Sequence, residues 1–313
     1  MKKYIAKRIL WAIPMLFAIS FVAFVLINFM PSDPAEVALR VNEIIPTEEA
    51  ILSMREQLGL DDPFFVRYFN WLSDCLKLDF GVSYTNTNRT VLEEIVRCLP
   101  ATINLALMSL VIVIVVSIPV GILCAVFKNS LFDRIIRTFI FIGTAMPNYW
   151  LGLLLIYVFA LKLKVLPSNG ATSFSHYILP AITLSMTYIS TYVRLIRNSM
   201  LDNLKENYVF YARARGLKNR SIVCKHVLKN SLQSCMTALG MSIVQLIAGT
   251  IVVENIFAIP GIGRLCISAI FNRDYPIIQA YIFMMGVLFV FCNLAIDIVQ
   301  CTIDPRLKRG IAK

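Results

Sequence analysis

Residues 102–127 read TINLALMSLVIVIVVSIPVGILCAVF and contain no charged side chain. Because an α-helix rises about 1.5 Å per residue, a run of this length is enough to cross a hydrocarbon layer about 30 Å thick. Five further apolar blocks lie at residues 9–30, 135–161, 178–196, 236–253 and 277–299. The sequence therefore predicts an all-α membrane protein with about six transmembrane helices.

The composition also favours a membrane protein over a soluble one. Hydrophobic residues make up 58% of the chain and charged residues 16%, with a mean hydropathy of +0.71, whereas about a quarter of the residues in a soluble domain are charged. The net charge is +11, but the basic residues flank apolar blocks and do not alternate with aromatic ones, so we expect no nucleic-acid partner. The eight cysteines form no CxxC pair, and we expect neither a metal site nor a cofactor.

The first apolar block begins after Lys2, Lys3, Lys7 and Arg8. A charged start also occurs in signal peptides, but about 20 apolar residues are enough to span a membrane, and no small-residue cleavage site follows them. Residues 1–30 are therefore predicted to form an N-terminal tail and an uncleaved first transmembrane helix.

The charged residues between the apolar blocks predict the orientation of the chain. Residues 31–100 hold 12 acidic and 6 basic residues, whereas residues 194–229 hold 9 basic and 2 acidic residues. Cytoplasmic loops are rich in Lys and Arg, so we expect a multi-pass protein of the inner (cytoplasmic) cell membrane with both termini in the cytoplasm. Residues 31–100 then form an extracytoplasmic cap segment, and residues 101–313 form a five-helix core.

Within the cap segment, Thr47 is a suitable N-cap for a helix that runs to Leu58 and stops at Gly59. A second helical stretch follows Asp61 and contains several aromatic residues. Two roles fit this segment equally well. It packs as a structural cap on the helix ends, or it offers a docking face to an external partner.

The basic loop at residues 201–232 is patterned like a pair of helices. We predict one helix over residues 203–215, a break at Gly216, and a second helix over residues 221–230 with Ser221 as its N-cap. Val223, Val227 and Leu228 would give the second helix an apolar stripe. Such a pair either docks into a groove on a cytoplasmic partner or lies on anionic lipid.

Two stretches of this loop, YARARGL at residues 211–217 and HVLKN at residues 226–230, resemble the coupling loop of ABC importer permeases. The likeness is to the dipeptide, oligopeptide and nickel branch. The wider family has Glu-Ala-Ala where this chain has Phe210, Tyr211 and Ala212, so the general signature is only partly kept. Residues 254–264 (ENIFAIPGIGR) also fit the branch, and residues 268–276 (SAIFNRDYP) are similar to the first permease subunit of nickel importers.

The resemblance covers nearly the whole chain, including the terminal residues 304–306 (DPR), and implies a type I permease fold with an outer cap between the first two spans. It implies a heterodimer with a second homologous permease, two ABC ATPase subunits below it and an external substrate-binding protein. The implied cargo is nickel, free or chelated. The alternative is a dipeptide, an oligopeptide or a metal carried by a metallophore. The chain has no GxxxxGK[ST] phosphate loop, so we expect it not to be the ATPase. The sequence also shows no other catalytic constellation, so we expect a non-catalytic subunit.

The resemblance and the residue chemistry together predict two sets of site residues. Asp297 either lines the pore or pairs with Arg194 or Arg197, and Glu254 either lines an outer gate or caps local structure. The apolar blocks contain no histidine, and their methionines are interpreted as packing residues, so no metal ligands are predicted. The ATPase-coupling candidates are Ala212, Arg213, Arg215, Gly216, Leu217, His226, Leu228 and Asn230; the pore or gate candidates are Asp297, Glu254, Pro260, Gly261 and Gly263.

Overall fold

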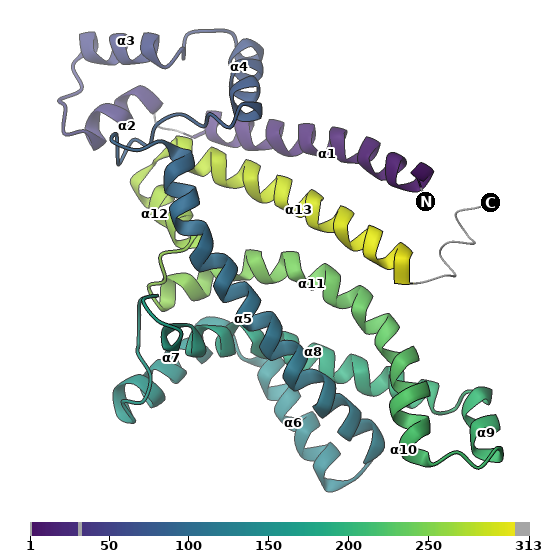
Figure 1. The fold of residues 1–313 in the computed structure, drawn as a ribbon. Helices are drawn as coiled ribbons and strands as arrows, with labels where there is room; N and C mark the ends of the chain where they lie inside the picture. Colours follow the sequence, from purple (N-terminus) through teal and green to yellow (C-terminus); the bar gives the residue numbers. More distant parts are fainter. Residues whose placement is uncertain (1, 31–32, 304–313) are drawn as a thin grey trace. The chain divides into compact units, whose positions relative to one another are not determined.

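The computed structural model describes residues 2–30 and 33–303, and helices dominate this part of the chain (Figure 1). The chain divides into two compact units. Of the described residues, unit 1 contains 103–259 and 295–303, and unit 2 contains 2–30, 33–102 and 260–294. Helices α5 (Val91–Val126) and α13 (Tyr275–Ile303) contribute to both units. The all-α prediction is confirmed.

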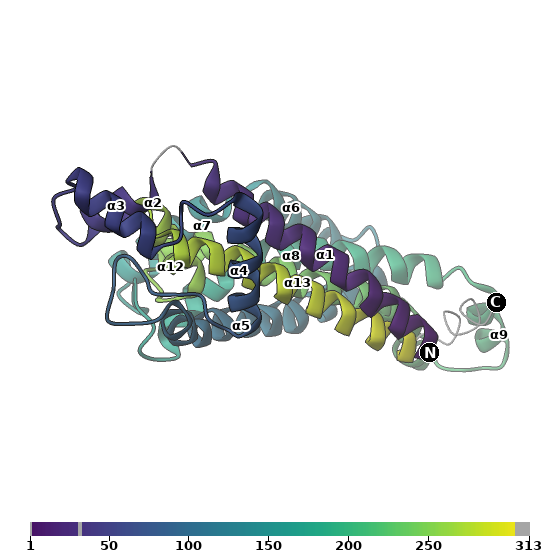
Figure 2. The ribbon, with the colours of Figure 1, turned by 90° about the horizontal axis from the view of Figure 1, so that it is seen from above.

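Unit 2 combines long apolar helices with the cap segment. Helix α1 (Lys2–Asn28) runs beside α13 (Figure 2), and a Cβ added to Gly286 of α13 would lie 2.4 Å from Ile19 Cγ2 of α1. Only a glycine therefore permits this close approach of the two helices. The remaining helices of the unit are α2 (Pro34–Val41), α3 (Glu48–Gln57), α4 (Phe64–Leu76) and α12 (Ile262–Asn272).

Local chemistry explains where the cap helices begin. Thr47 Oγ1 accepts a hydrogen bond from Ala50 N at 3.3 Å, as predicted for the start of α3, and the chain turns away at Gly59 with a φ of 60°. Helix α2 was not predicted, although Asp33 followed by Pro34 is a helix-start signal. Its Asp33 carboxylate accepts a hydrogen bond from Ala35 N at 2.9 Å.

An aromatic cluster and one buried carboxylate hold the cap segment to the helices of unit 2. The ring centroid of Trp71 in α4 lies 5.6 Å from that of Phe24 in α1 and 5.9 Å from that of Phe283 in α13. Asp274, fully buried before α13, accepts a hydrogen bond from Ser83 Oγ in the loop that precedes α5. The loop and the start of α13 are thereby joined within one unit.

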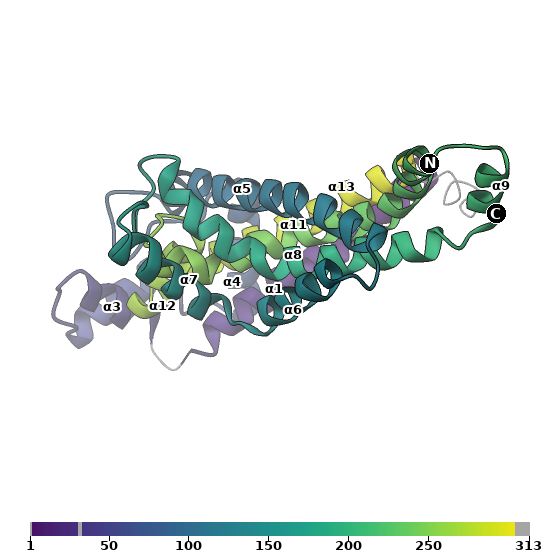
Figure 3. The ribbon, with the colours of Figure 1, turned by 90° about the horizontal axis from the view of Figure 1, so that it is seen from below.

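Unit 1 is built around helix α8 (Ser175–Asn203), which lies against α6 (Leu131–Ala145), α7 (Asn148–Leu155) and α11 (Leu228–Ile256). Figure 3 shows α6 and α8 side by side. A π-helical segment, η1 (Ile156–Lys162), extends α7. Between α8 and α11 lie α9 (Asn207–Ala214), α10 (Asn219–Ser221) and the π-helical segment η2 (Ile222–Val227).

The described residues contain four helices that are long and apolar enough to cross a membrane, or five if one bent pair is counted as a span. The bent pair, Leu131–Ala145 with Asn148–Lys162, turns by 107°, where we predicted one span from the apolar block at residues 135–161. Pro147 explains the break, because the residue before a proline is pushed out of the helical region, and Met146 has a ψ of 124°.

Helix α8, which contains the predicted fourth span at residues 178–196, is 29 residues long. It is not among the helices that are apolar enough to be counted as spans. Its buried residues include Thr183, Ser185 and Ser190. A helix enclosed by its neighbours can keep hydroxyl groups that a lipid-facing helix avoids, because other protein atoms surround them. Helix length and composition alone therefore identify four or five spans among the described residues, fewer than the roughly six that we predicted.

Candidate functional site

The chain reverses at Gly216, directly after α9. Gly216 has a φ of 76°, in the left-handed region that glycine favours. Its N–H donates to Arg213 O at 2.9 Å, and the N–H of Leu217 donates to Ala212 O at 3.2 Å. These two bonds form a Schellman motif, which ends a helix and satisfies its last carbonyl groups. The predicted break at Gly216 is confirmed.

Apolar contacts fix α9 to its own unit. Val209 and Ala212 are buried in a cluster with Ile196 and Met200 of α8 and with Ile222 of η2. The hydroxyl of Tyr208 also donates to Asn203 Oδ1 at 3.0 Å. Helix α9 is therefore attached to α8 at several points.

Two details of the predicted helix pair are wrong. The first helix begins at Asn207, not at residue 203, because α8 continues through Asn203. Ser221 is not an N-cap. It has helical dihedral angles and lies within a helical run that begins after Lys218. Lys218 has an extended ψ of 138° and its carbonyl accepts the N–H of Ser221 at 2.8 Å.

The predicted apolar stripe faces the inside of unit 1. Val227 is fully buried, and Val223 and Leu228 pack partly buried against the same cluster that holds α9. The stripe is therefore used within the chain and is not available to a partner. The fully buried Ile222 belongs to the same cluster, and it was not singled out in the sequence.

The residues that remain accessible form a mixed aromatic and basic surface at the end of α9. Phe210 and Tyr211 are 70% and 65% exposed, and their ring centroids lie 6.0 Å apart. Exposed aromatic and arginine side chains are typical of protein–protein contacts. We call the following residues the coupling face: Phe210, Tyr211, Arg213, Arg215, Gly216 and Leu217.

The other coupling candidates lie elsewhere on the same unit. Ala212 is buried beneath the coupling face, so it supports the face and does not contribute to it. His226 in η2 and Asn230 in α11 are exposed. The structure brings the candidates of residues 212–217 together in one turn, and it leaves His226 and Asn230 on the following helical run.

A buried ion pair connects α6 to α8. Arg197 Nε and Nη2 lie 2.8 and 2.9 Å from the two carboxylate oxygens of Asp133. Asp133 is fully buried in the first turn of α6 and also accepts the N–H of Asn129 at 2.9 Å, while Arg137 Nε lies 3.6 Å away. The sequence did not predict this ion pair with its two hydrogen bonds; there, Arg197 was considered only as a partner of Asp297.

The pore and gate candidates are divided between the two units. The backbone of Asp297 lies in α13, but its side chain falls outside the described residues. Glu254 in α11 is fully buried, so it could line a passage only after a movement that exposes it. In unit 2, Gly261 and Gly263 are buried at the start of α12, and Pro260 is exposed.

Among the described residues, no group of three His, Cys, Asp or Glu side chains is arranged to hold a metal ion. Cys75 in the cap segment illustrates the chemistry of the buried cysteines. Burial and the nearby carboxylates of Asp74 and Asp79 raise the pKa of its thiol to about 12. The thiol is therefore protonated at neutral pH, and a thiol is a much weaker metal ligand than a thiolate.

Comparison with known proteins decides the family. Residues 117–309 match the family described as binding-protein-dependent transport system inner membrane component, and residues 1–106 match the N-terminal part of such membrane components. The chain belongs to this family of ABC importer permeases. A permease of this kind is the non-catalytic membrane component, and ATP hydrolysis lies in partner subunits.

Known proteins are similar to this permease over nearly its whole length. A metal-staphylopine import system permease protein, CntB, of Staphylococcus aureus is 38% identical over 99% of both chains. The glutathione transport system permease protein GsiC of Escherichia coli is 36% identical over 98% of this chain and 99% of its own length. A probable peptide ABC transporter permease of Sinorhizobium fredii is also 36% identical.

A solved structure supports the fold. The permease resembles a chain of the MetNI methionine ABC transporter in an inward-facing conformation, with a TM-score of 0.58 and 18% identity. The match covers 67% of this permease and 96% of that chain. The predicted permease fold is confirmed.

The Asp133–Arg197 pair generates a prediction about stability. Arg197→Gln leaves Asp133 buried without its main partner, and we expect it to destabilise the permease by about 3 kcal/mol. Asp133→Asn together with Arg197→Gln should recover most of that loss, because neither side chain is then charged. Unfolding of the purified permease by increasing SDS, followed by circular dichroism, measures both changes.

Arg134→Gln is the matched control, since Arg134 is an exposed arginine of α6 next to Asp133. It should unfold like the wild type. Equal stability of Arg197→Gln and Arg134→Gln would contradict a structural role for the ion pair.

Proposed function

We propose that this permease forms half of the translocation pore of an ATP-driven importer, paired with a second homologous permease, and that the coupling face binds an ATPase subunit. The observation that carries the proposal is the turn at Gly216. It exposes two aromatic and two basic side chains while Val209 and Ala212 anchor the same helix in unit 1. A surface that is exposed to a partner and rigidly attached to a long helix suits the transfer of movement.

Movement would follow a short path through unit 1. Closure of the ATPase subunits would displace α9, and the apolar cluster would carry α8 with it. The Asp133–Arg197 pair would then carry α6, because two hydrogen bonds fix the guanidinium to the carboxylate. The balance of basic and acidic residues supports a cytoplasmic coupling face and cytoplasmic termini.

We propose nickel, free or as a chelate, as the cargo. Residues 268–276 support this choice through their similarity to the first permease subunit of nickel importers. The S. aureus relative is named for import of a metal–staphylopine complex, whereas the E. coli and S. fredii relatives are named for glutathione and peptide transport. Import of a dipeptide, an oligopeptide or a metallophore complex is therefore the second candidate.

Two substitutions test the coupling. Gly216→Pro removes the N–H that donates to Arg213 O and forces φ to about −65°, and Arg215→Glu reverses a charge of the coupling face. We expect either change to reduce uptake at least tenfold while the purified importer complex still forms. Uptake and substrate-stimulated ATPase activity should be measured on the same reconstituted complex.

Lys205→Glu is the control, because Lys205 is an exposed basic residue of the same loop outside the coupling face. It should retain near-normal uptake. Normal uptake and normal ATPase stimulation in Gly216→Pro would show that the turn has no part in coupling.

The cargo is tested by uptake of nickel-63 in cells that lack this permease and in cells in which it is restored. We expect nickel uptake to depend on the permease and to resist competition by an excess of dipeptide. Loss of dipeptide uptake with unchanged nickel uptake would instead support the second candidate.

A further inference from the structure

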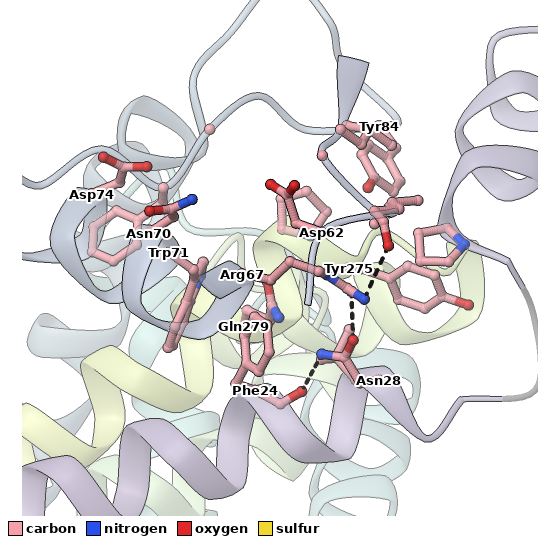
Figure 4. Close-up of a pocket in the computed structure, with 18 of the residues that line it drawn as sticks. Phe24, Asn28, Asp62, Arg67, Asn70, Trp71, Asp74, Tyr84, Tyr275 and Gln279 are labelled. Carbon is pink, nitrogen blue, oxygen red and sulfur yellow. Dashed lines mark hydrogen bonds between the residues drawn. The ribbon is translucent and has the colours of Figure 1, made fainter. Parts of the chain in front are cut away.

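Unit 2 contains a cavity of about 630 Å³ that is lined by polar, charged and aromatic side chains (Figure 4). Its walls come from the end of α1, the start of α2, α3 and the turn that follows it, α4, the loop before α5 and the start of α13. All of these elements belong to the same unit. The volume falls within the range of small-molecule sites, about 300–1,000 Å³.

Arg67 presents an uncompensated positive charge to this cavity. Its guanidinium donates to Asn28 Oδ1 at 2.5 Å and to Leu60 O at 3.4 Å, and it lies 5.9 Å from the centre of the Phe24 ring. Among the described residues, no carboxylate lies within 4.0 Å of it. Because a guanidinium has five N–H groups, three remain for another partner while two hold it in place.

Asp62 presents an uncompensated negative charge to the same cavity. Asp62 is labelled in Figure 4 among the residues that line the cavity, and its side chain is exposed to solvent. Within the described part of the chain this carboxylate makes no hydrogen bond or ion pair. The other acidic side chains of the lining each have a partner: Asp33 with Arg55, Asp74 with Lys77, and Asp79 with the N–H of Gly81.

Arg67 and Asp62 do not pair with each other, since hydrogen bonds to Asn28 and Leu60 hold the guanidinium and Asp62 is exposed to solvent. A fixed cation and an unpaired anion on the walls of one cavity are complementary to a ligand that carries both charges.

Aromatic side chains form the rest of the wall. Trp71, Tyr84 and Tyr275 line the cavity, and the ring centroids of Tyr84 and Tyr275 lie 6.3 Å apart. Burial, and then the charge of nearby Asp274, raise the pKa of the Tyr84 phenol above its usual range. Tyr84 therefore keeps its proton and can donate a hydrogen bond, while the rings offer apolar surface to a side chain.

We propose that this cavity binds a small zwitterion that bears a carboxylate and an ammonium group, such as an amino acid, a short peptide or an aminocarboxylate. Arg67 receives the carboxylate through its remaining N–H groups, and Asp62 receives the ammonium group. The new element is the site, which lies in the cap segment and does not depend on ATP coupling; its ligand class includes the peptides named above as the second candidate cargo.

The test is equilibrium binding to the whole importer complex in lipid nanodiscs, without nucleotide and without the external binding protein. The probe is L-alanyl-L-phenylalanine, titrated by calorimetry. The amide of this dipeptide lacks the carboxylate, and its N-acetyl derivative lacks the ammonium group. We expect each derivative to bind at least tenfold more weakly than the dipeptide, a comparison that needs no substitution in the protein.

Two variants assign the charges to residues. Arg67→Gln should bind the dipeptide and its amide with equal affinity, and Asp62→Asn should bind the dipeptide and its N-acetyl derivative with equal affinity. Arg40→Gln is the control and should bind like the wild type, because Arg40 is an exposed arginine of α2 that pairs with Glu36 and does not line the cavity.

The proposal is overturned if the wild-type complex does not bind the dipeptide, or if the amide and N-acetyl derivatives bind as tightly as the dipeptide. It is also overturned if Arg67→Gln still discriminates against the amide, since the carboxylate would then bind elsewhere. A complex that binds the dipeptide as expected but fails to import nickel or peptides would contradict the proposed function and leave the cavity assignment intact.

Discussion

No water reaches the hydrocarbon layer of a membrane, so every backbone N–H and C=O group within it has to be paired inside the protein. The long helices α1, α5, α11 and α13 meet this requirement by pairing their own groups. Several polar side chains of α8 and α11 are also paired inside the protein. Thr183 Oγ1 donates to Leu179 O, Ser185 Oγ to Ile182 O, and the hydroxyls of Tyr192 and Ser242 bond to each other. Helix α8 can therefore be more polar than its neighbours without leaving groups unpaired.

Helices that pair their own backbone groups behave as rods, so their relative positions depend on side-chain contacts between them. In unit 1 these contacts include the apolar cluster around Val209 and Ala212 and the ion pair between Asp133 and Arg197. The first fixes α9 to α8, and the second fixes α8 to α6. A partner that moves the coupling face would then act on three helices through two contacts.

Features with local causes could be predicted from the sequence. The cap at Thr47 depends on residues three apart, and the break at Gly216 depends on a conformation that glycine favours. Features that depend on distant residues were missed. Arg197 binds Asp133, and nothing near either residue in the sequence specifies that pairing. The apolar stripe of residues 223–228 was predicted correctly as apolar, but its partner is the cluster around Ile196 and Met200 within the same chain. The cavity around Arg67 also collects residues from six segments, so it has no contiguous signature.

Photo-crosslinking from Phe210 is a direct test of the proposed contact between the coupling face and an ATPase subunit. Phe210 is 70% exposed and Phe271 of α12 is 83% exposed, so each can be replaced by p-benzoylphenylalanine in the importer complex within native membranes. The account predicts that position 210 crosslinks to an ATPase subunit and that position 271 does not. Crosslinking of position 210 to lipid alone, or capture of the ATPase from position 271, would contradict it.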